Sequence, residues 1–511
     1  MTTPELAARL GALTSWHADW KGLRVAVFGL AMTGFSVADT LAELGARVIV
    51  VTEAADEHYA RLLPVIGVEL VEQPGIEVAP ERLTAFDADL VVVSPGFPPS
   101  HPLLTWAESE RIEVWGDIEL AWRVRDKVLR ADGTPAEWIS ITGTNGKTTT
   151  TQLTATFLAA GGVRAAPCGN IGVPILDAVR DPGGFDVLVV ELSSHQLHWV
   201  RRGGPGALHP FSSVCLNIAE DHLEWHGSFD AYLGAKAKVY ENTKTACVYN
   251  KADEMTIRMV EDADVEEGAR AIGFGLGVPG PSDFGVIEGI LVDRAFLDDR
   301  HHTALELSTV AELRERGLGA AHIVANILAA AALARSFGVE TGVIHDVLET
   351  FRLDHHRIEV VTRHRGVEWV DDSKATNPHA ADASLRAFEP VVWIVGGLLK
   401  GVHVDDLVRA HAGRLRAAVL IGQNRDAVRD AFRRHAPEVP LAEVTTTERG
   451  LPVMTEAVRL ADGAAEPGDT VLLAPAAASF DQFAGYDERG DLFTSAVRGL
   501  VAGDSGEGDA D

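Results

Sequence analysis

Cysteine is scarce in this sequence. The three cysteines, Cys168, Cys215 and Cys247, are too few and too scattered for a disulfide framework or a cysteine-based zinc site. Disulfides are also rare in proteins that work in a reducing compartment. We therefore expect a cytoplasmic protein without disulfide bonds.

Export and membrane signals are missing as well. The N-terminus, MTTPELAARLGALTSW, lacks the basic start and apolar core of a signal peptide. The longest apolar stretch, 323–334, contains Asn326 and is far short of the ~20 residues that cross a bilayer. We expect a buried helix in this stretch and no membrane insertion.

Positive charge is in deficit. Lysine and arginine number 45 against 74 aspartates and glutamates, which gives a formal net charge of −29. A protein that binds nucleic acid through its bulk charge needs the opposite sign. We therefore expect no nucleic-acid partner.

Strand-like and helix-like segments alternate along most of the chain, which predicts parallel sheets covered by helices. Its 511 residues exceed what one core can hold and suggest about three domains. A polar stretch, 125–137, is the first predicted linker, and a second boundary is expected near Leu353. The predicted strands span 24–28, 47–51, 89–93, 138–142, 186–190, 213–217, 368–370, 391–395, 417–421 and 470–473.

The sequence GTNGKTT, 143–149, stands between a predicted strand and a predicted helix, 150–158. Glycines let backbone N–H groups turn inward, and a helix N-terminus favours an anion. Lys147 would reach the outer phosphates of ATP, and the Thr148 hydroxyl would bind Mg²⁺. The spacing is shorter than the common GxxxxGK[ST] pattern, because position 141 is Ile, and a turn without function is the alternative.

Three further polar residues follow in the central part of the chain. Glu191 ends a buried strand, where an acid is placed to hold Mg²⁺, although it could instead cap the next helix. His222 follows the next strand, and a lone histidine is more often structural than a ligand. Lys236 lies in the segment AKAKVY, 235–240, which on composition is a solvated helix face.

The first domain opens with a glycine loop, 29–34, between a strand and a helix. A dinucleotide site with Glu53 on the ribose is one interpretation, but position 31 is Ala, so the middle glycine of GxGxxG is missing. Together with the loop Ser94-Pro95-Gly96, this sheet edge suits a nucleoside diphosphate better than NAD. Two loops shaped only for packing remain the alternative.

Polar loops follow three strands of the last domain. They are DDSKATNP (371–378), GGLLK (396–400) and PAAASFDQF (475–483). Binding crevices of α/β sheets form beyond the carboxyl ends of their strands. Two of these loops carry a lysine, so we expect a site for a small dianion.

With these motifs, nearly the whole chain, from about Leu23 to Gly499, resembles the Mur ligase family of peptidoglycan synthesis. GTNGKTT is shared with folylpolyglutamate synthetases, whereas DSKATN (372–377) and SFDQF (479–483) resemble the branch that adds D-glutamate to UDP-N-acetylmuramoyl-L-alanine. GDIEL (116–120) and ELSSHQL (191–197) agree with that branch.

The resemblance implies an α/β fold of three domains: a Rossmann-like UDP-binding domain at 1–122, a central P-loop ATPase-like domain with a mostly parallel sheet at 123–353, and a C-terminal Rossmann-like domain at 354–511. On composition, residues 503–511 are expected to be disordered. The implied reaction consumes ATP, proceeds through an acyl phosphate, and uses two Mg²⁺ ions and a carbamylated Lys236. A monomer is expected.

The resemblance also implies roles for individual residues. Lys147, Lys236, His222 and Arg357 would be catalytic, and the metal ligands would be Thr148, Glu191, His222 and carbamylated Lys236. ATP would be bound by Gly143, Thr144, Asn145, Gly146, Lys147, Thr148, Thr149, Asn326, Arg357 and Asp372. The UDP substrate would contact Met32, Thr33, Ser94, Gly96, Asn170 and Gln196. D-Glutamate would contact Lys374, Thr376, Lys400, Ser479, Phe480 and Tyr486.

Four positions depart from the family pattern. Thr52 replaces an acid near the uracil, with Glu53 next door; Ile323 replaces an Asn near the adenine; and His195 and Tyr486 replace phenylalanines. Two rival functions stay open. A related ligase for another amino acid should lack DSKATN, and a nicotinamide-dependent dehydrogenase leaves Lys147, Lys374 and Lys400 unexplained.

Overall fold

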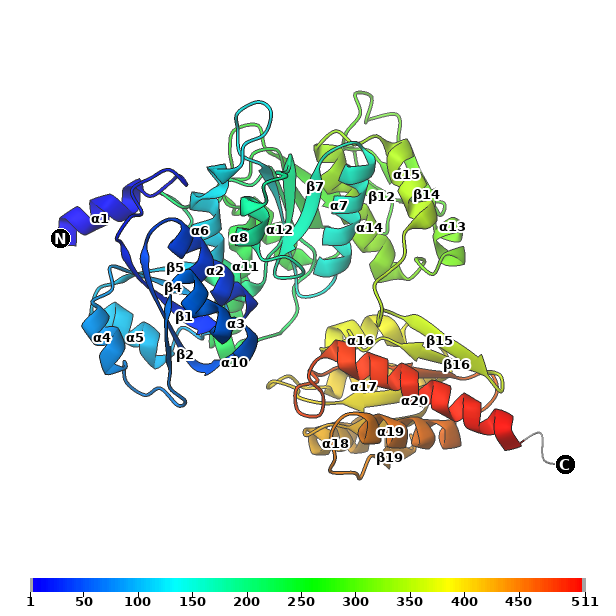
Figure 1. Ribbon diagram of the computed structural model, residues 1–511. Coiled ribbons are helices and arrows are strands. Elements are labelled where there is room, and N and C mark those ends of the chain that lie inside the picture. The colour runs from blue at the N-terminus through cyan, green and yellow to red at the C-terminus, as the bar shows by residue number, and fades with distance from the viewer. Residues whose placement is uncertain (1–2, 508–511) are drawn as a thin grey trace. The chain divides into compact units, whose positions relative to one another are not determined.

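The computed structural model describes residues 3–507, and its secondary structure forms three sheets, one for each expected domain (Figure 1). The predicted mixed α/β fold with mostly parallel strands is thus confirmed. The chain divides into two compact units. The first holds the first two sheets, and the second holds the third sheet together with the short segments 219–224 and 320–322. The exact domain boundaries stay a prediction.

The first sheet has five parallel strands in the order β3-β2-β1-β4-β5. The apolar run at β1 is fully buried because helices cover both of its faces. The strands are β1 (Arg24–Leu30), β2 (Arg47–Ala55), β3 (Glu69–Glu72), β4 (Leu90–Val93) and β5 (Glu113–Gly116), and the helices are α1 (Thr3–Ala12), α2 (Met32–Glu43), α3 (Glu57–Leu62), α4 (Glu81–Phe86), α5 (Pro102–Ser109) and α6 (Asp117–Arg123).

The second sheet has nine strands in the order β14-β13-β12-β11-β10-β9-β6-β8-β7, and only β13 is antiparallel to its neighbours. Its strands are β6 (Glu137–Thr142), β7 (Ala165–Gly169), β8 (Val187–Glu191), β9 (Ser212–Cys215), β10 (Ala246–Asn250), β11 (Arg270–Phe274), β12 (Asp283–Ile287), β13 (Ile290–Asp293) and β14 (Leu305–Thr309). Its helices are α7 (Lys147–Ala160), α8 (Ile175–Arg180), α9 (Ser194–Trp199), α10 (Leu223–His226), α11 (Phe229–Ala237), α12 (Glu254–Glu261), α13 (Val310–Glu315), α14 (Ala321–Ser336) and α15 (Thr341–Thr350).

One apolar core runs through both of these domains, which explains why they form a single unit. It joins Trp115 and Trp122 of the first domain to Trp138 and Leu176 of the second. The expected buried helix at 323–334 is confirmed as the inner part of α14. None of the helices within residues 3–507 has the length and apolar character needed to span a membrane.

The third sheet has six strands in the order β15-β16-β20-β17-β18-β19, and only β15 is antiparallel. Helices α19 and α20 lie together on one side of it, and α20 runs beside β15 and β16 (Figure 1). The strands are β15 (Glu359–His364), β16 (Val367–Asp371), β17 (Val391–Gly396), β18 (Leu415–Ile421), β19 (Leu441–Glu443) and β20 (Thr470–Leu473), and the helices are α16 (Pro378–Leu385), α17 (Asp405–His411), α18 (Arg425–His435), α19 (Leu451–Ala464) and α20 (Tyr486–Glu507).

Helix α20 corrects the predicted end of the ordered chain. Disorder was expected from Gly503 because the tail is acidic and poor in apolar residues, but the helix continues to Glu507. A helix that is already packed through Phe493 and Val497 gains one backbone hydrogen bond for each added residue, so it can extend past its last core contact. The rest of the predicted tail, 508–511, lies outside the described residues.

Candidate active site

The GTNGKTT segment forms a tight loop between β6 and α7, as expected. Gly143 and Gly146 both have positive φ, 150° and 83°. A Cβ on Gly146 would lie 2.5 Å from the Asn326 side-chain oxygen. Only glycine therefore fits there, and the predicted ATP ligand Asn326 lies directly against the loop.

Hydrogen bonds hold this loop in its shape. The Asn145 N–H donates to the Asn217 side-chain oxygen at 2.8 Å, and the Asn217 amide donates back to the Asn145 carbonyl at 3.1 Å. The Thr144 hydroxyl lies 2.8 Å from the Tyr232 hydroxyl. Thr148 and Thr149 sit in the first turn of α7 and are buried. The loop is thus preformed at a helix N-terminus, where an anion is favoured.

Two lysines meet at the carbonyl oxygen of Gly143. The Lys147 ammonium donates to it at 3.0 Å and to the Thr144 carbonyl at 3.0 Å, whereas Lys236 donates to the Gly143 carbonyl at 2.8 Å. Lys236 is only 2% exposed, on the inner face of α11. Its interpretation as a solvated helix residue is therefore wrong, because AKAKVY does not reveal that α11 turns this lysine toward the loop.

Glu191 ends β8 and is 1% exposed. Its Oε1 accepts a hydrogen bond from the Asn170 amide at 2.9 Å, while its Oε2 is buried without a hydrogen-bond partner among the described residues. It caps no helix, since Ser193 caps α9. An orphaned buried carboxylate oxygen is expensive unless a cation satisfies it.

Mg²⁺ fits this environment. Within residues 3–507, no cluster of three or more His, Cys, Asp or Glu side chains could hold a metal by itself. Mg²⁺ usually keeps several waters and binds through one or two protein oxygens plus substrate phosphates. One carboxylate oxygen of Glu191 and the hydroxyl of Thr148 suit that mode of binding.

His222 and Gln196 occupy different surroundings. His222 belongs to the segment 219–224, which groups with the second unit; it has a left-handed φ of 52°, and its Nε2 lies 3.6 Å from an Asp221 carboxylate oxygen. Gln196 is buried and donates to Asp117 at 2.8 Å, which ties the second domain to the first. Burial raises the pKa of Asp117 to about 6.

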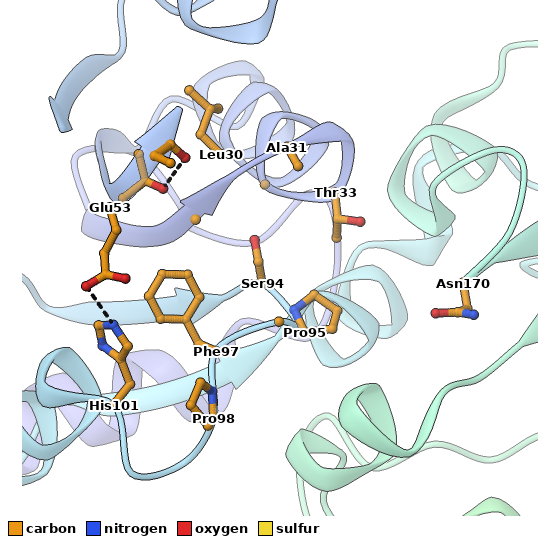
Figure 2. Close-up of a pocket in the computed structure, with 15 residues that line it drawn as sticks. Leu30, Ala31, Thr33, Glu53, Ser94, Pro95, Phe97, Pro98, His101 and Asn170 are labelled. Carbon is orange, nitrogen blue, oxygen red and sulfur yellow. Dashed lines mark hydrogen bonds and ion pairs between the residues drawn. The ribbon is translucent and has the colours of Figure 1, made fainter. Parts of the chain in front are cut away.

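A cavity of about 520 Å³ lies at the carboxyl edge of the first sheet (Figure 2). Of the residues expected to contact the UDP substrate, Thr33, Ser94, Gly96 and Asn170 line it. Met32 does not; it is 46% exposed at the start of α2. The full lining is Gly29, Leu30, Ala31, Thr33, Gly34, Thr52, Glu53, Ala54, Ser94, Pro95, Gly96, Phe97, Pro98, His101 and Asn170.

The end of this cavity away from Asn170 contains Glu53, which the sequence analysis considered, and also Phe97 and His101, which it did not single out. Figure 2 shows Glu53 and His101 facing each other beside the ring of Phe97. The His-Pro pair that caps and opens α5 was the available signal for His101. Thr52 is buried, and its hydroxyl donates to the Ala54 carbonyl.

The three polar loops of the last domain follow neighbouring strands, β16, β20 and β17, so they share one sheet edge. Leu398 and Ala478 exchange two backbone hydrogen bonds, at 2.9 and 3.0 Å, and so join the loop of Lys400 to that of Ser479. Lys374 lies 3.8 Å from the centre of the Tyr486 ring and donates to its hydroxyl. The Thr376 N–H donates to the Lys374 carbonyl at 2.8 Å, and Phe480 is 63% exposed. The three loops therefore share one sheet edge, and the D-glutamate contacts of their residues stay a prediction.

Arg489 of α20, which the sequence did not indicate, holds two of these loops together. It is fully buried, and it donates to the Ser373 hydroxyl at 2.9 Å, to the Ser373 carbonyl at 2.7 Å and to the Ala477 carbonyl at 3.1 Å. Burial lowers its pKa to about 10, so it remains charged at neutral pH. No local motif pairs Arg489 with residues so distant in the chain.

Asp372 and Arg357 lie near the start of this domain. Burial raises the pKa of Asp372 to about 6, and its carboxylate accepts hydrogen bonds from the Ser384 hydroxyl and the Ile358 N–H. The Arg357 Nε is buried without a partner among the described residues. The neighbouring His356 bonds Asp371 at 2.7 Å, and this hydrogen bond raises the pKa of His356.

Comparisons with known proteins agree with this arrangement. Three family models match: the MurD-like N-terminal domain of Mur ligases over residues 23–116, the Mur ligase middle domain over 141–334, and the Mur ligase glutamate ligase domain over 356–477. The UDP-N-acetylmuramoylalanine–D-glutamate ligase of Leifsonia xyli subsp. xyli is 66% identical over 98% of this chain and 97% of its own length. The ligase of the same name from Streptomyces avermitilis is 50% identical over 95% of this chain and 100% of its own.

Among solved structures, a pseudomurein peptide ligase type C from Methanothermus fervidus matches 93% of this chain and 100% of its own, with a TM-score of 0.57. At 17% sequence identity, this similarity shows only that the two proteins share a fold.

Proposed function

The chain belongs to the Mur ligase family, and we propose that it joins D-glutamate to UDP-N-acetylmuramoyl-L-alanine with hydrolysis of ATP to ADP and phosphate. The observation that carries this proposal is the shared sheet edge of Lys374, Lys400 and Ser479, two cations and a hydroxyl suited to an amino acid with two carboxylates. The preformed phosphate loop provides the proposed binding site for the phosphates of ATP.

The chemistry follows from these groups. The free carboxylate of the UDP substrate attacks the γ-phosphorus, ADP leaves, and an acyl phosphate forms. The amine of D-glutamate then attacks the acyl carbon, loses a proton and expels phosphate as the amide forms. Lys147 moves from the loop carbonyls to the phosphoryl oxygens, and Arg357 adds a second positive charge there.

Two Mg²⁺ ions, when bound, would neutralise phosphate charge, and Glu191, Thr148, His222 and Lys236 are the proposed ligands. A bare ammonium at Lys236 would repel the metal, whereas a carbamate on its Nζ offers oxygen ligands instead. Lys236 is buried beside the Gly143 carbonyl, next to the phosphate loop. We therefore propose that Lys236 works as a carbamate.

Chemical rescue tests the carbamate. Lys236→Ala should be nearly inactive, and acetate or formate should restore part of the turnover by placing oxygens in the vacated space. Lys244→Ala is the matched control, because Lys244 pairs with Glu137 away from the loop and its loss should change little. Full activity of Lys236→Ala without added carboxylate would refute this role.

A phosphate-release assay with a panel of amino acids tests the proposed function. D-Glutamate should trigger turnover, D-alanine should be poor because it lacks the second carboxylate, and L-glutamate should fail because inversion misplaces the amine or a carboxylate. Lys400→Ala should raise the KM for D-glutamate by the equivalent of about 2–5 kcal/mol if the pair is desolvated, and leave the KM for the UDP substrate unchanged. If L-glutamate or a diamino acid outperforms D-glutamate, the chain is a different ligase of this family.

We also propose an oligomeric state and a cellular compartment for this protein. One chain carries all three domains that the chemistry requires, so we propose that it acts as a monomer. We place it in the cytoplasm, where ATP is available and where three buried thiols stay reduced. Its net charge of −29 disfavours binding to nucleic acid, so we propose no nucleic-acid partner.

A further inference from the structure

Another cavity, of about 310 Å³, lies beside helix α11 in the second domain. Its lining includes four residues of this helix: Asp230, Leu233, Gly234 and Ala237. Residues three and four positions apart lie on the same face of a helix. One face of α11 therefore forms a wall of the cavity.

Another face of α11 carries the two side chains that contact the phosphate loop. The Tyr232 hydroxyl lies 2.8 Å from the Thr144 hydroxyl, and the Lys236 ammonium donates to the Gly143 carbonyl at 2.8 Å. Both side chains are buried, and neither lines the cavity. Helix α11 thus stands between the cavity and the phosphate loop, so a molecule in the cavity would restrain the helix that supports the loop.

Gly234 keeps this cavity open. It stands inside α11, where glycine is less favourable than alanine. It does not have a positive φ, and a Cβ at this position would meet no other atom within 4 Å. Neither the backbone nor the packing therefore requires a glycine here. A ligand site does account for it, because any side chain at this position would take up part of the cavity.

The rest of the lining indicates the class of ligand. Its apolar surface includes Met255 and Met259, and methionine adapts to ligands of different shapes. Its charged residues are three acids and two arginines. Each arginine already has an acidic partner, since Arg202 pairs with Glu241 and Arg258 lies 3.5 Å from Glu254.

The other two acids of the lining are Asp230 and Asp262. Neither has an ion-pair partner among the described residues. Two carboxylates at the border of an apolar cavity favour a ligand that is apolar in its body and positively charged at one end.

We propose that this cavity binds a small apolar amine in its ammonium form, and that the bound amine holds α11 against the phosphate loop. The ammonium lies near Asp230 and Asp262, and the apolar body packs against the two methionines and the backbone of Gly234. A helix restrained on one face loses less freedom when ATP orders the loop on its other face, so the two ligands bind cooperatively. Binding of the amine does not depend on the proposed function; only its link to ATP does.

Binding of 2-phenylethylammonium to the full chain, followed by ligand-detected NMR, tests the site. The matched compounds 2-phenylethanol and 3-phenylpropionate carry the same ring but are neutral and negative. We expect the ammonium to bind roughly threefold more tightly than the alcohol, because exposed carboxylates attract a cation only modestly, and 3-phenylpropionate to bind most weakly. In the double variant Asp230→Asn, Asp262→Asn, the ammonium and the alcohol should bind equally.

Gly234→Leu fills the cavity from its wall, so it should weaken binding of the ammonium roughly tenfold or more. Gly234→Ala also improves the helix but leaves most of the cavity empty, so it should bind nearly like the parent. Gly463→Leu in α19 is the control for a leucine placed elsewhere, since a Cβ there also meets nothing within 4 Å. Melting temperatures report whether each variant folds, and if Gly234→Leu does not, the double aspartate variant still decides.

Saturating 2-phenylethylammonium should also slow amide hydrogen exchange in segment 143–149 and lower the Kd for ATP about twofold in the parent, and do neither in Gly234→Leu. Absence of binding to the parent, equal binding of the three compounds, or undiminished binding to a folded Gly234→Leu would overturn the site. Binding without any change at the loop would overturn the cooperation with ATP. If the parent releases no phosphate with D-glutamate, the proposed function fails, and the binding measurements still decide the site.

Discussion

The phosphate loop of the second domain and the polar loops of the third lie at the same kind of place, the carboxyl edge of a parallel sheet, yet they are held differently. The phosphate loop is fixed by neighbours within its own sheet, since Asn217 follows the adjacent strand β9 and bonds Asn145 in both directions. Two loops of the third domain, those of Ser373 and Ala477, are held by Arg489 of helix α20. The first site is therefore encoded by a local motif, and the second depends on a distant residue.

The two sites also differ in what their lysines touch. Lys147 and Lys236 both hold the Gly143 carbonyl, so a phosphate has to compete with a hydrogen bond that already exists. Lys374 donates instead to the Tyr486 hydroxyl and lies against the Tyr486 ring, a cation–π contact that an entering carboxylate need not break. Mutations in the first site should thus act on turnover, and mutations in the second on the KM for the amino acid.

The largest effect is expected at Lys147. Lys147→Ala should lower kcat by on the order of 10²-fold or more, because the charge on the transferred phosphoryl group loses a fixed cation. The KM for the UDP substrate should change little. Steady-state phosphate release is the measurement, with Lys244→Ala as a variant of the same size away from the loop. Near-normal ligation by Lys147→Ala would contradict the assignment of this loop as the phosphate-binding site.

Gly146→Ala tests whether the loop must be preformed. Its φ of 83° and the Asn326 oxygen, 2.5 Å from where a Cβ would stand, forbid a side chain without a shift of the loop. We expect kcat to fall at least tenfold, since strained backbone costs roughly 1–3 kcal/mol. Gly172→Ala, at a φ of 60° with open space around it, is the control for positive φ alone. Equal effects of both variants would mean that strain and not the loop's shape is responsible.

Arg489→Lys probes the helix that fastens the third domain. Lysine keeps the charge but cannot make three directed hydrogen bonds, so Ser373 and Ala477 should separate. We expect the KM for D-glutamate to rise roughly tenfold at little change in the KM for ATP. Arg498→Lys on the exposed side of the same helix should behave like the parent. A fall in kcat with an unchanged KM for D-glutamate would contradict the contrast between the two sites.

The smallest effect is expected at Asp117, which links the first domain to the second through its hydrogen bond with Gln196. Burial raises the pKa of Asp117 from its ordinary value of 3.8 to about 6 in the folded protein, so folding favours its protonated form. The parent therefore loses stability as the pH rises from about 4 to about 6, and the loss is complete above that range. Asp117→Asn stays neutral and can still accept from Gln196.

Melting temperatures across this pH range check the expectation. The advantage of Asp117→Asn over the parent should be absent near pH 4, open up to about pH 6 and then stay constant. An advantage that is greatest at pH 4 would show that the carboxylate, not the acid, is the form that the fold prefers.

The sequence predicted the sheets and the phosphate loop well because both depend on neighbours in the chain. Apolar runs marked the buried strands, and glycines at 143 and 146 marked the positive φ values. Prediction from the sequence failed where two contacting residues are far apart in the chain, and where the composition of a segment suggested the wrong burial. Arg489 meets Ser373 only in the folded domain, and Lys236 stands in a segment that looks solvated.

An isotope measurement tests the central claim most directly, that the carboxylate of the UDP substrate is activated by phosphate before the amine arrives. UDP-N-acetylmuramoyl-L-alanine labelled with ¹⁸O in its free carboxylate is incubated with ATP, Mg²⁺ and D-glutamate, and the released phosphate is analysed by mass spectrometry. We expect one ¹⁸O in each phosphate, because the oxygen that attacks the γ-phosphorus leaves with it, and one ¹⁸O retained in the new amide. Unlabelled phosphate would contradict it, because the γ-phosphate would then have been transferred to water and not to the carboxylate.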